Sequence, residues 1–506
     1  MATEWILTEG TPYPHLSDVE RLPDFGYSDF AEPYPTWMWR LVSVHRYPYL
    51  APLTPVDTSF PSGAYRTAIA RHSRRSKMTG MVTPGGDGAV PFDIADEDIV
   101  SGSLRITQEL MSDDFYTPGG VPCAELQLGL FTAQTGVELY GAEIALSFWL
   151  YLEDIEAETE EERWYEIPLG AFTVQEAVRS SERALTIKAY DDMVKFERVS
   201  FADLEIEQGR QYTPFEIIVL VAAAAGIELA TSQAFIDGLR NGQTKFTLSD
   251  INSGIVTARD LLMHICQIIG CFAFIDRWRR LCIRKLGLPR DTDPEITATI
   301  ASHQRYRSEY SQLIYQLYAL ELHTVKYNSN GTGSEVLDIK HVSARPIGVT
   351  VELPENPLWP VLSYEDEEWR VACELVLQHI GDDLENVMYP PSECVTTGDP
   401  SLTLGDWVDC TGWTAGESTQ FPLTTIEWVY HGQTAIRACG KDAIAGVVKS
   451  QKDKAEAASQ ENALWFSLTV MRDIYLRMMQ YYSGLKGFTH KEIGQFTHKQ
   501  IEEGKA

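Results

Sequence analysis

Two long stretches of the chain alternate apolar and polar residues with the two-residue period of a β-strand, and this pattern most constrains the fold. In the first stretch, Ser103–Glu109 and Ala124–Phe131 alternate; in the second, Leu317–Tyr327 and Glu335–Val342 flank a turn at residues 328–331. Short alternating segments separated by turn residues are typical of antiparallel sheets and barrels. The sequence therefore predicts an α+β fold that is mostly β.

Helices interrupt this pattern where capping residues precede an apolar run. Thr213 is followed by Pro214 and by Glu216, which is a capping box with proline in the first turn, and the apolar run ends at Gly226. The same signals predict helices at Thr257–Gly270 and at Ser363–Gly381. Two strands, Cys271–Asp276 and Leu281–Leu286, follow the second helix and are joined through Arg277–Arg280.

The order of these patterns divides the chain of 506 residues into five parts. We expect an irregular, aromatic-rich attachment arm at 1–90, a β domain at 91–202, a small α/β domain at 203–300, a second β domain with one helix at 301–445, and a helical tail at 446–506. Met1 is followed by Ala2, Thr3 and Glu4, without the basic and apolar regions of a signal peptide, and the longest apolar run is too short to cross a membrane. We therefore expect a soluble protein made in the cytoplasm.

Two internal repeats lie at the ends of the chain. Trp5–Leu16 and Trp39–Leu50 share Trp, Leu, Tyr, Pro and Leu in register, and FTHKEI at Phe488–Ile493 recurs as FTHKQI at Phe496–Ile501. Aromatic segments that contain proline need a surface to lie on, which this chain or a partner would supply. The residues that we select for partner docking are Trp5, Tyr13, Trp39, Tyr47, Phe488, His490, Phe496 and His498.

The charge is strongly acidic and unevenly distributed. The 42 basic and 72 acidic residues give a net charge of −30, which argues against a protein that grips nucleic acid. One basic cluster, Arg66–Lys77, is interpreted as a solvated loop or as a docking patch for an acidic partner. The acidic run Glu153–Glu162 lies between two predicted strands and is interpreted as a solvated hairpin loop.

The longer catalytic motifs are absent from the sequence, and Ser483–Lys486 matches the short S-x-x-K pattern without its companion motifs. It contains no G-x-S-x-G, H-E-x-x-H, G-x-x-x-x-G-K-[ST] or G-x-G-x-x-G pattern. His264, Cys266, Cys271 and Cys282 would be the ligands of a zinc site, but their spacing does not match a C-x₂₋₄-C knuckle, so we interpret the cysteines as reduced core residues. We predict no catalytic residue, no metal and no cofactor.

An ordered set of segments resembles the hub region of tail-associated proteins from bacteriophages of Gram-positive bacteria, which belong to the tail baseplate hub and tail-tip proteins. The segments are IPLGAFTV at Ile167–Val174, LTIKAYDDMVKF at Leu185–Phe196, the helix and hairpin at Thr257–Leu286, LGDW at Leu404–Trp407, and Thr425–Gly432. The resemblance covers roughly residues 95–445. It rests on the order of the segments, because no single one of them is specific.

The resemblance implies two tube-type antiparallel β-barrel domains and a structural virion protein. Three copies would form a homotrimer ring that continues the tail tube and lets DNA pass through an acidic lumen during ejection. Further partners would be a tube or distal tail protein and a spike or fibre, with no cofactor, no membrane span and a place in the virion tail. Two alternatives stay open: a tail-tip cell-wall hydrolase, and a carbohydrate-binding adhesin that uses Trp37, Trp39, Trp407, Trp413 and Trp428.

Overall fold

A computed structural model describes residues 62–438, apart from gaps at 72, 86–89, 111–115, 133–138, 154, 158, 252–253, 287–295, 312–313, 328–333, 345–347, 366 and 412–417. Both repeats, the eight residues selected for docking and the predicted helical tail lie outside the described residues. In the described part of the chain, the helices are too short or too polar to cross a membrane.

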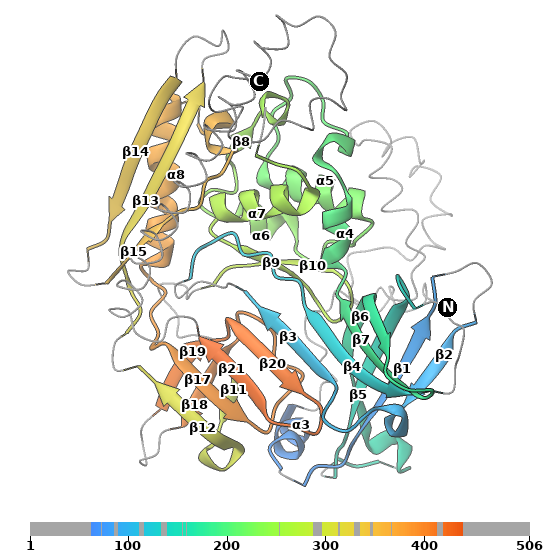
Figure 1. Cartoon of the computed structure of the whole chain (residues 1–506). Helices are drawn as coiled ribbons and strands as arrows, with labels where there is room; N and C mark the ends of the chain where they lie inside the picture. Colours follow the sequence, from blue (N-terminus) through green and yellow to red (C-terminus); the bar gives the residue numbers. More distant parts are fainter. Residues whose placement is uncertain are drawn as a thin grey trace, which may run out of the picture. The chain divides into compact units, whose positions relative to one another are not determined.

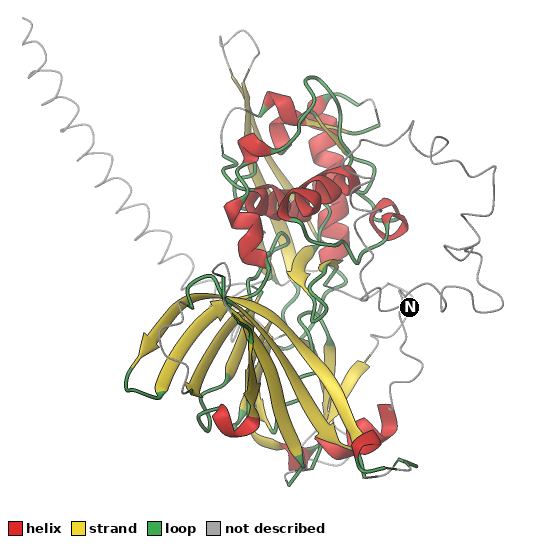
Figure 2. Ribbon diagram, turned by 90° about the vertical axis from the view of Figure 1, so that its right-hand side faces the viewer, coloured by secondary structure: helices red, strands yellow, loops and turns green. Residues whose placement is uncertain are grey.

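Eleven strands form one antiparallel sheet, which curves below the helices of the middle region (Figures 1 and 2). Its strands alternate as predicted: every second residue of β5 is buried, because successive side chains point to opposite faces. In spatial order the strands are β12 (Arg305–Tyr310), β17 (Ser392–Thr396), β21 (Thr434–Ala438), β20 (Thr425–Val429), β3 (Arg105–Glu109), β4 (Glu125–Phe131), β7 (Ala184–Tyr190), β6 (Trp164–Arg179), β5 (Glu143–Tyr151), β1 (Ser76–Thr83) and β2 (Phe92–Ala95).

The centre of this sheet joins strands that are more than 300 residues apart in the chain. Strand β20 pairs with β3, with Trp428 opposite Ile106. The two predicted β regions therefore share one sheet, and each contributes a continuous half to it. A pair of closed barrels is not present in the described residues, because one edge of each half pairs with the other half. The strands β12 and β2 stand at the two ends of the described strand order.

The first half of the sheet begins earlier than the alternating pattern indicated. Residues 62–83, which we assigned to an irregular arm, contain the helix α3 (Ser62–Ile69) and the strand β1, and β1 pairs along its whole length with β5. In the second half, a smaller sheet is formed by β11 (Ile296–Ile300), β18 (Trp407–Thr411) and β19 (Ser418–Pro422).

The helices of the middle region follow the capping residues. The Thr213 hydroxyl accepts the N–H of Glu216 and the Glu216 carboxylate accepts the N–H of Thr213 at the start of α5, which ends before Gly226 at a left-handed φ of 68°. Thr257 and Asp260 cap α7 in the same way. The helices are α4 (Met193–Arg198), α5 (Pro214–Ala225), α6 (Gln233–Asp237) and α7 (Ala258–Ile268), and the hairpin after them is β9 (Phe272–Ile275) and β10 (Leu281–Arg284).

A further sheet and helix pack beside this layer (Figure 1). The predicted hairpin is confirmed as β13 (Leu317–Tyr327) and β14 (Ser334–Val342), and β15 (Val349–Glu352) lies parallel to β13. The helix predicted to start at Ser363 is instead α8 (Trp369–Leu384), because β16 (Leu362–Ser363) pairs with β8 (Lys245–Phe246). Buried Asn241 donates to the carbonyl oxygens of Ile268 and Val376, which connects α7 to α8.

Candidate functional site: the junction of the two sheet halves

The turn between β9 and β10, residues 276–280, is shaped by its own first residue. The Asp276 carboxylate accepts the backbone N–H groups of Trp278 and Arg280 and the Nε–H of Arg280. Arg279 adopts a left-handed conformation with φ of 68°, which is strained for a residue with a side chain. The turn therefore holds its arginines in fixed directions, and we call residues 276–280 the arginine turn.

Arg279 connects the arginine turn to the first half of the sheet. Its two terminal nitrogens donate to the two carboxylate oxygens of Glu143 at 2.8 and 2.7 Å, and its Nε donates to Asp192 at 2.8 Å. Asp192 is buried, with 2% of its side chain exposed, and Lys195 also contacts it at 2.8 Å. A fork-shaped guanidinium between two carboxylates gives charge-assisted hydrogen bonds of defined direction.

Two neighbouring arginines connect the same hairpin to the second half. Arg277 donates to the carbonyl oxygen of Ser401 at 2.6 Å, and Arg284 donates to the carbonyl oxygen of Leu404 at 2.8 Å. Arg284 also pairs with Asp406 at 2.7 Å. The loop of residues 397–406 is thus fixed to the hairpin, so that the β9–β10 hairpin binds both halves of the sheet.

The basic cluster holds the other side of this loop. Tyr65 donates to Asp399 at 2.6 Å, Arg66 pairs with Asp399 at 2.9 Å, and Arg74 donates to the carbonyl oxygens of Thr397 and Gly398 at 2.8 and 2.6 Å. Buried backbone carbonyls need such donors, because they are cut off from water. This part of the basic cluster is therefore neither a solvated loop nor a free docking patch.

Two further arginines of the cluster, Arg71 and Arg75, lie against the acidic run. The run forms the predicted hairpin loop between β5 and β6, but two of its carboxylates are paired: Glu153 with Arg71, and Glu160 with Arg75 at 3.0 Å. Arg75 also lies over the Tyr151 ring, 4.0 Å from its centroid. Two ion pairs thus join the basic cluster to the acidic run within one chain.

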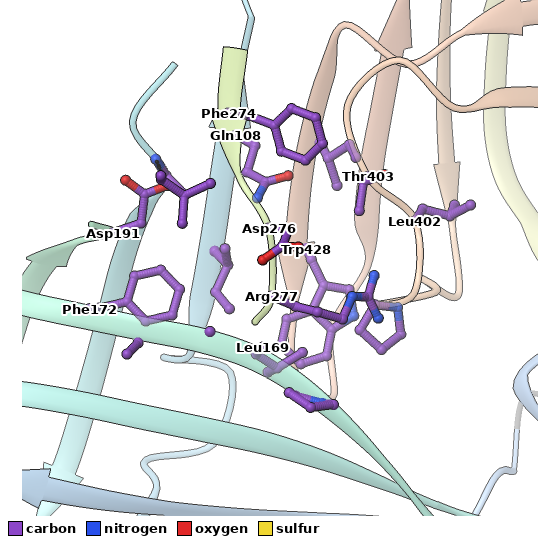
Figure 3. Close-up of a pocket in the computed structure, with 18 of the residues that line it drawn as sticks. Gln108, Leu169, Phe172, Asp191, Phe274, Asp276, Arg277, Leu402, Thr403 and Trp428 are labelled. Atoms are coloured by element: carbon purple, nitrogen blue, oxygen red, sulfur yellow. Dashed lines mark hydrogen bonds between the residues drawn. The ribbon is translucent and has the colours of Figure 1, made fainter. Parts of the chain in front are cut away.

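A small pocket lies where the halves meet (Figure 3). It encloses about 60 Å³, well below the roughly 300 Å³ of ordinary ligand pockets. The indole of Trp428, 3% exposed, forms one wall and packs edge-to-face on Phe148. All five segments of the resemblance or their direct neighbours contribute to the lining, together with Ile106, Gln108, Ala124, Asp399 and Pro400. Their contributions are residues 168–172, Asp191, 274–277, 402–403, and Ile426 with Trp428.

Asp191 is one of two buried carboxyls that line this pocket, the other being Asp276 of the arginine turn. Asp191 accepts the backbone N–H groups of Ala124 and Met193 and the thiol of Cys123. Burial raises the pKa of Asp191 to about 6, although its hydrogen bonds act in the opposite direction. The carboxyl therefore ties β4 to the start of α4, and its ionisation is unfavourable in this position.

A second, more open cavity of about 670 Å³ lies between β4 and α7, and it has the size of a ligand pocket. Cys123 and His264 both line it, which would suit a thiol nucleophile and its base. Burial raises the pKa of the Cys123 thiol, and burial lowers the pKa of His264. The thiol is therefore held protonated, as a donor to Asp191, and is not activated.

The four residues considered for zinc do not gather. Among the described residues, His264, Cys266, Cys271 and Cys282 do not bring three ligand atoms within 4.8 Å of one another. Cys266 and Cys271 are fully buried, and burial raises the pKa of both Cys271 and Cys282 to about 12. Their role as reduced core residues agrees with this environment.

Of the aromatic residues considered for an adhesin, the structure describes two. Trp407 and Trp428 are buried, 7% and 3% exposed, so they do not form part of an exposed stripe. Trp37, Trp39 and Trp413 lie outside the described residues. The arginine turn was visible in the sequence only as a connection between strands, although Asp276 two residues before Trp278 is a known turn signal.

No protein-family model matches the chain, and no curated protein matches it. Among solved structures, the chain is similar to the 43 kDa tail protein of prophage MuSo2 from Shewanella oneidensis, with 13% identity over 71% of this chain and 97% of that chain and a TM-score of 0.38. It is similar to a tail protein from Neisseria meningitidis MC58, with 12% identity over 72% and 99% and a TM-score of 0.40. It is also similar to prophage tail protein gp18 from Listeria monocytogenes EGD-e, with 11% identity over 74% and 98% and a TM-score of 0.39.

Proposed function

We propose that this chain is a structural subunit of a phage-type tail, a baseplate hub or tail-tip component of the virion. One observation carries the proposal: the segments whose order resembles tail-associated proteins all meet at the junction of the two sheet halves. Residues 168–172 of β6, Asp191 after β7, the β9–β10 hairpin, the 402–406 loop and β20 line the same pocket or bind its walls. Segments that define a shared fold are expected to form one packed unit.

The assembly that we propose is a ring of three copies. The phage-type tail that contains it would act on a Gram-positive bacterium. In the described residues, β12 and β2 are the outermost strands of the large sheet, and the edges of sheets are usually covered in a finished assembly. Closure of each sheet half into a tube-type barrel would then occur between copies. A net charge of −30 suits a lumen that lets DNA pass without binding it.

The terminal repeats are proposed as arms that dock a tube or distal tail protein and a spike or fibre. Deletion of Gly487–Ala506 should abolish docking of a neighbouring tail protein and leave the ring intact. Normal tail assembly without these residues would contradict this role. A matched deletion of the residues before Ser62 tests the other arm in the same way.

The test of the central proposal is the mass of the full chain in solution, followed by negative-stain imaging. A mass near three times 56.9 kDa and rings with a central hole are the expected results. A protein that stays monomeric and forms no rings even in the presence of its tail partners would refute the ring. Peptidoglycan cleavage in a zymogram or selective binding on a glycan array would instead favour a hydrolase or an adhesin.

A further inference from the structure

Three metal-ligating side chains meet far from the sheet junction. His341 of β14 lies beside Asp382, near the end of α8, and Glu385, the residue after α8. The His341 Nε2 is 3.2 Å from a Glu385 oxygen and 4.0 Å from an Asp382 oxygen, and all three ligand atoms lie within 4.8 Å of one another. The side chains of His341, Glu385 and Asp382 are 13%, 16% and 27% exposed, so the cluster is shielded from bulk water.

A glycine inside α8 makes this position of His341 possible. A Cβ atom at Gly381 would lie 2.2 Å from the His341 Cδ2 and 2.6 Å from its Nε2. Glycine within a helix costs about 1 kcal/mol relative to alanine. The glycine therefore allows the imidazole to lie against the helix backbone, with its Nε2 directed at the two carboxylates.

The charges at this end of α8 favour a bound cation. Asp382, Asp383 and Glu385 all stand at the C-terminal end of the helix, where the helix dipole favours positive charge and disfavours carboxylates. Arg240 donates to Asp382 at 2.6 Å, and Lys285 pairs with Asp383 at 2.7 Å. A divalent metal ion bound at this end of α8 would place positive charge beside these carboxylates, where the helix dipole favours it.

We propose that His341, Asp382 and Glu385 bind a divalent transition-metal ion such as zinc. Zinc accepts imidazole nitrogen and carboxylate oxygen at roughly 2.0–2.2 Å, which places tetrahedral ligands about 3.3 Å apart. The spacings of 3.2 and 4.0 Å are close to this value, so small side-chain rotations would complete the site. Water would take the remaining position. The Arg240 contact orients Asp382 through its second oxygen, as outer partners of metal ligands do.

The metal would fasten β14 to α8. His341 belongs to the sheet β13–β14–β15, and both carboxylates belong to the end of the helix that packs on that sheet. A single ion bound by both elements stabilises their packing by binding the folded state only.

The experiment uses the full chain, treated with a chelator and then dialysed, at pH 7.5. Zinc affinity is measured by competition with a chromophoric chelator for the wild type and for His341→Ala, Glu385→Gln and Gly381→Ala. His323→Ala is the matched control, because His323 is a histidine of the same sheet that pairs with the single carboxylate of Asp338. Circular dichroism melting without zinc shows whether each variant is folded.

We expect one zinc equivalent that binds at least about tenfold more weakly in His341→Ala and Glu385→Gln and unchanged in His323→Ala. Gly381→Ala should weaken binding while all three ligands remain. Zinc should also raise the melting temperature of the wild type more than that of Glu385→Gln, whose glutamine has nearly the shape of glutamate but lacks its charge. Equal affinity in the wild type and in the folded variants would overturn the proposal and assign any zinc uptake to other histidines or cysteines.

Discussion

Replacement of Arg279 by alanine should destabilise the junction by about 2 kcal/mol. Breaking a buried ion pair on one side costs roughly 3–5 kcal/mol when the other charge is left without compensation. Here Asp192 is buried but keeps Lys195 at 2.8 Å, and both Arg279 and Glu143 have 37% of their side chains exposed, so solvent screening reduces the loss. Arg279→Gly loses the same side chain, but glycine adopts the left-handed conformation without strain. This variant should therefore be more stable than Arg279→Ala by about 1 kcal/mol.

The assay is urea unfolding of the full chain followed by tryptophan fluorescence, with the midpoint and slope compared among variants. A double-mutant cycle with Glu143→Gln isolates the coupling between the arginine turn and β5, because each single change removes the same bidentate contact. A loss below about 0.5 kcal/mol for Arg279→Ala, or a coupling of zero, would refute the view that this turn fastens the hairpin to the first sheet half. A glycine variant less stable than the alanine variant would refute the backbone argument.

Three further predictions concern the same junction. Trp428→Ala should lose about 3–5 kcal/mol in denaturant unfolding, whereas Trp428→Phe should lose less than about 1.5 kcal/mol, because the indole N–H has no partner among the described residues. Because burial raises the pKa of Asp191 to about 6, the folded state holds its proton more tightly than the unfolded chain, so stability should fall by up to about 3 kcal/mol as pH rises from about 4 to 6 and then level off. Asp191→Asn should remove this slope in a pH series of melting curves. Arg74→Met should cost about 2 kcal/mol by leaving the carbonyls of Thr397 and Gly398 without their donor, and a thermal melt as high as that of the wild type would contradict this.

The sequence predicts those elements whose signals are local. Helix α5 begins and ends where Thr213, Glu216 and Gly226 indicate, since capping hydrogen bonds involve residues three apart. The prediction of the β13–β14 hairpin is also confirmed, because alternation and a turn suffice to define a hairpin. Helix α8 shows the limit of such signals. Ser363 is a good capping residue, but it belongs to β16, which pairs with β8 nearly 120 residues earlier in the chain, and the helix begins only at Trp369.

The candidate site depends on contacts that alternation cannot reveal. Strand β20 would satisfy its hydrogen bonds beside any antiparallel neighbour, and its pairing with β3, in which Trp428 lies opposite Ile106, depends on side-chain packing between distant segments. The period of two defines which face of a strand is buried but carries no information about its neighbour. For this reason the alternation alone does not define how the strands join into sheets, and the two predicted β-barrel domains are not confirmed in the described residues.

The charge pattern, in contrast, contains a signal about contacts between distant segments. In a chain with 42 basic and 72 acidic residues, cations are scarce, yet three arginines stand in the arginine turn and four in the segment 66–75. A scarce cation has many carboxylates within reach, and arginine is suited to bidentate pairing and to carbonyl groups at buried junctions. Both clusters in fact bind segments that are distant in the chain: Arg279 contacts Glu143, and Arg74 contacts the loop after Thr396. In strongly acidic chains, a local concentration of arginine therefore indicates an internal junction before it indicates a surface for an acidic partner.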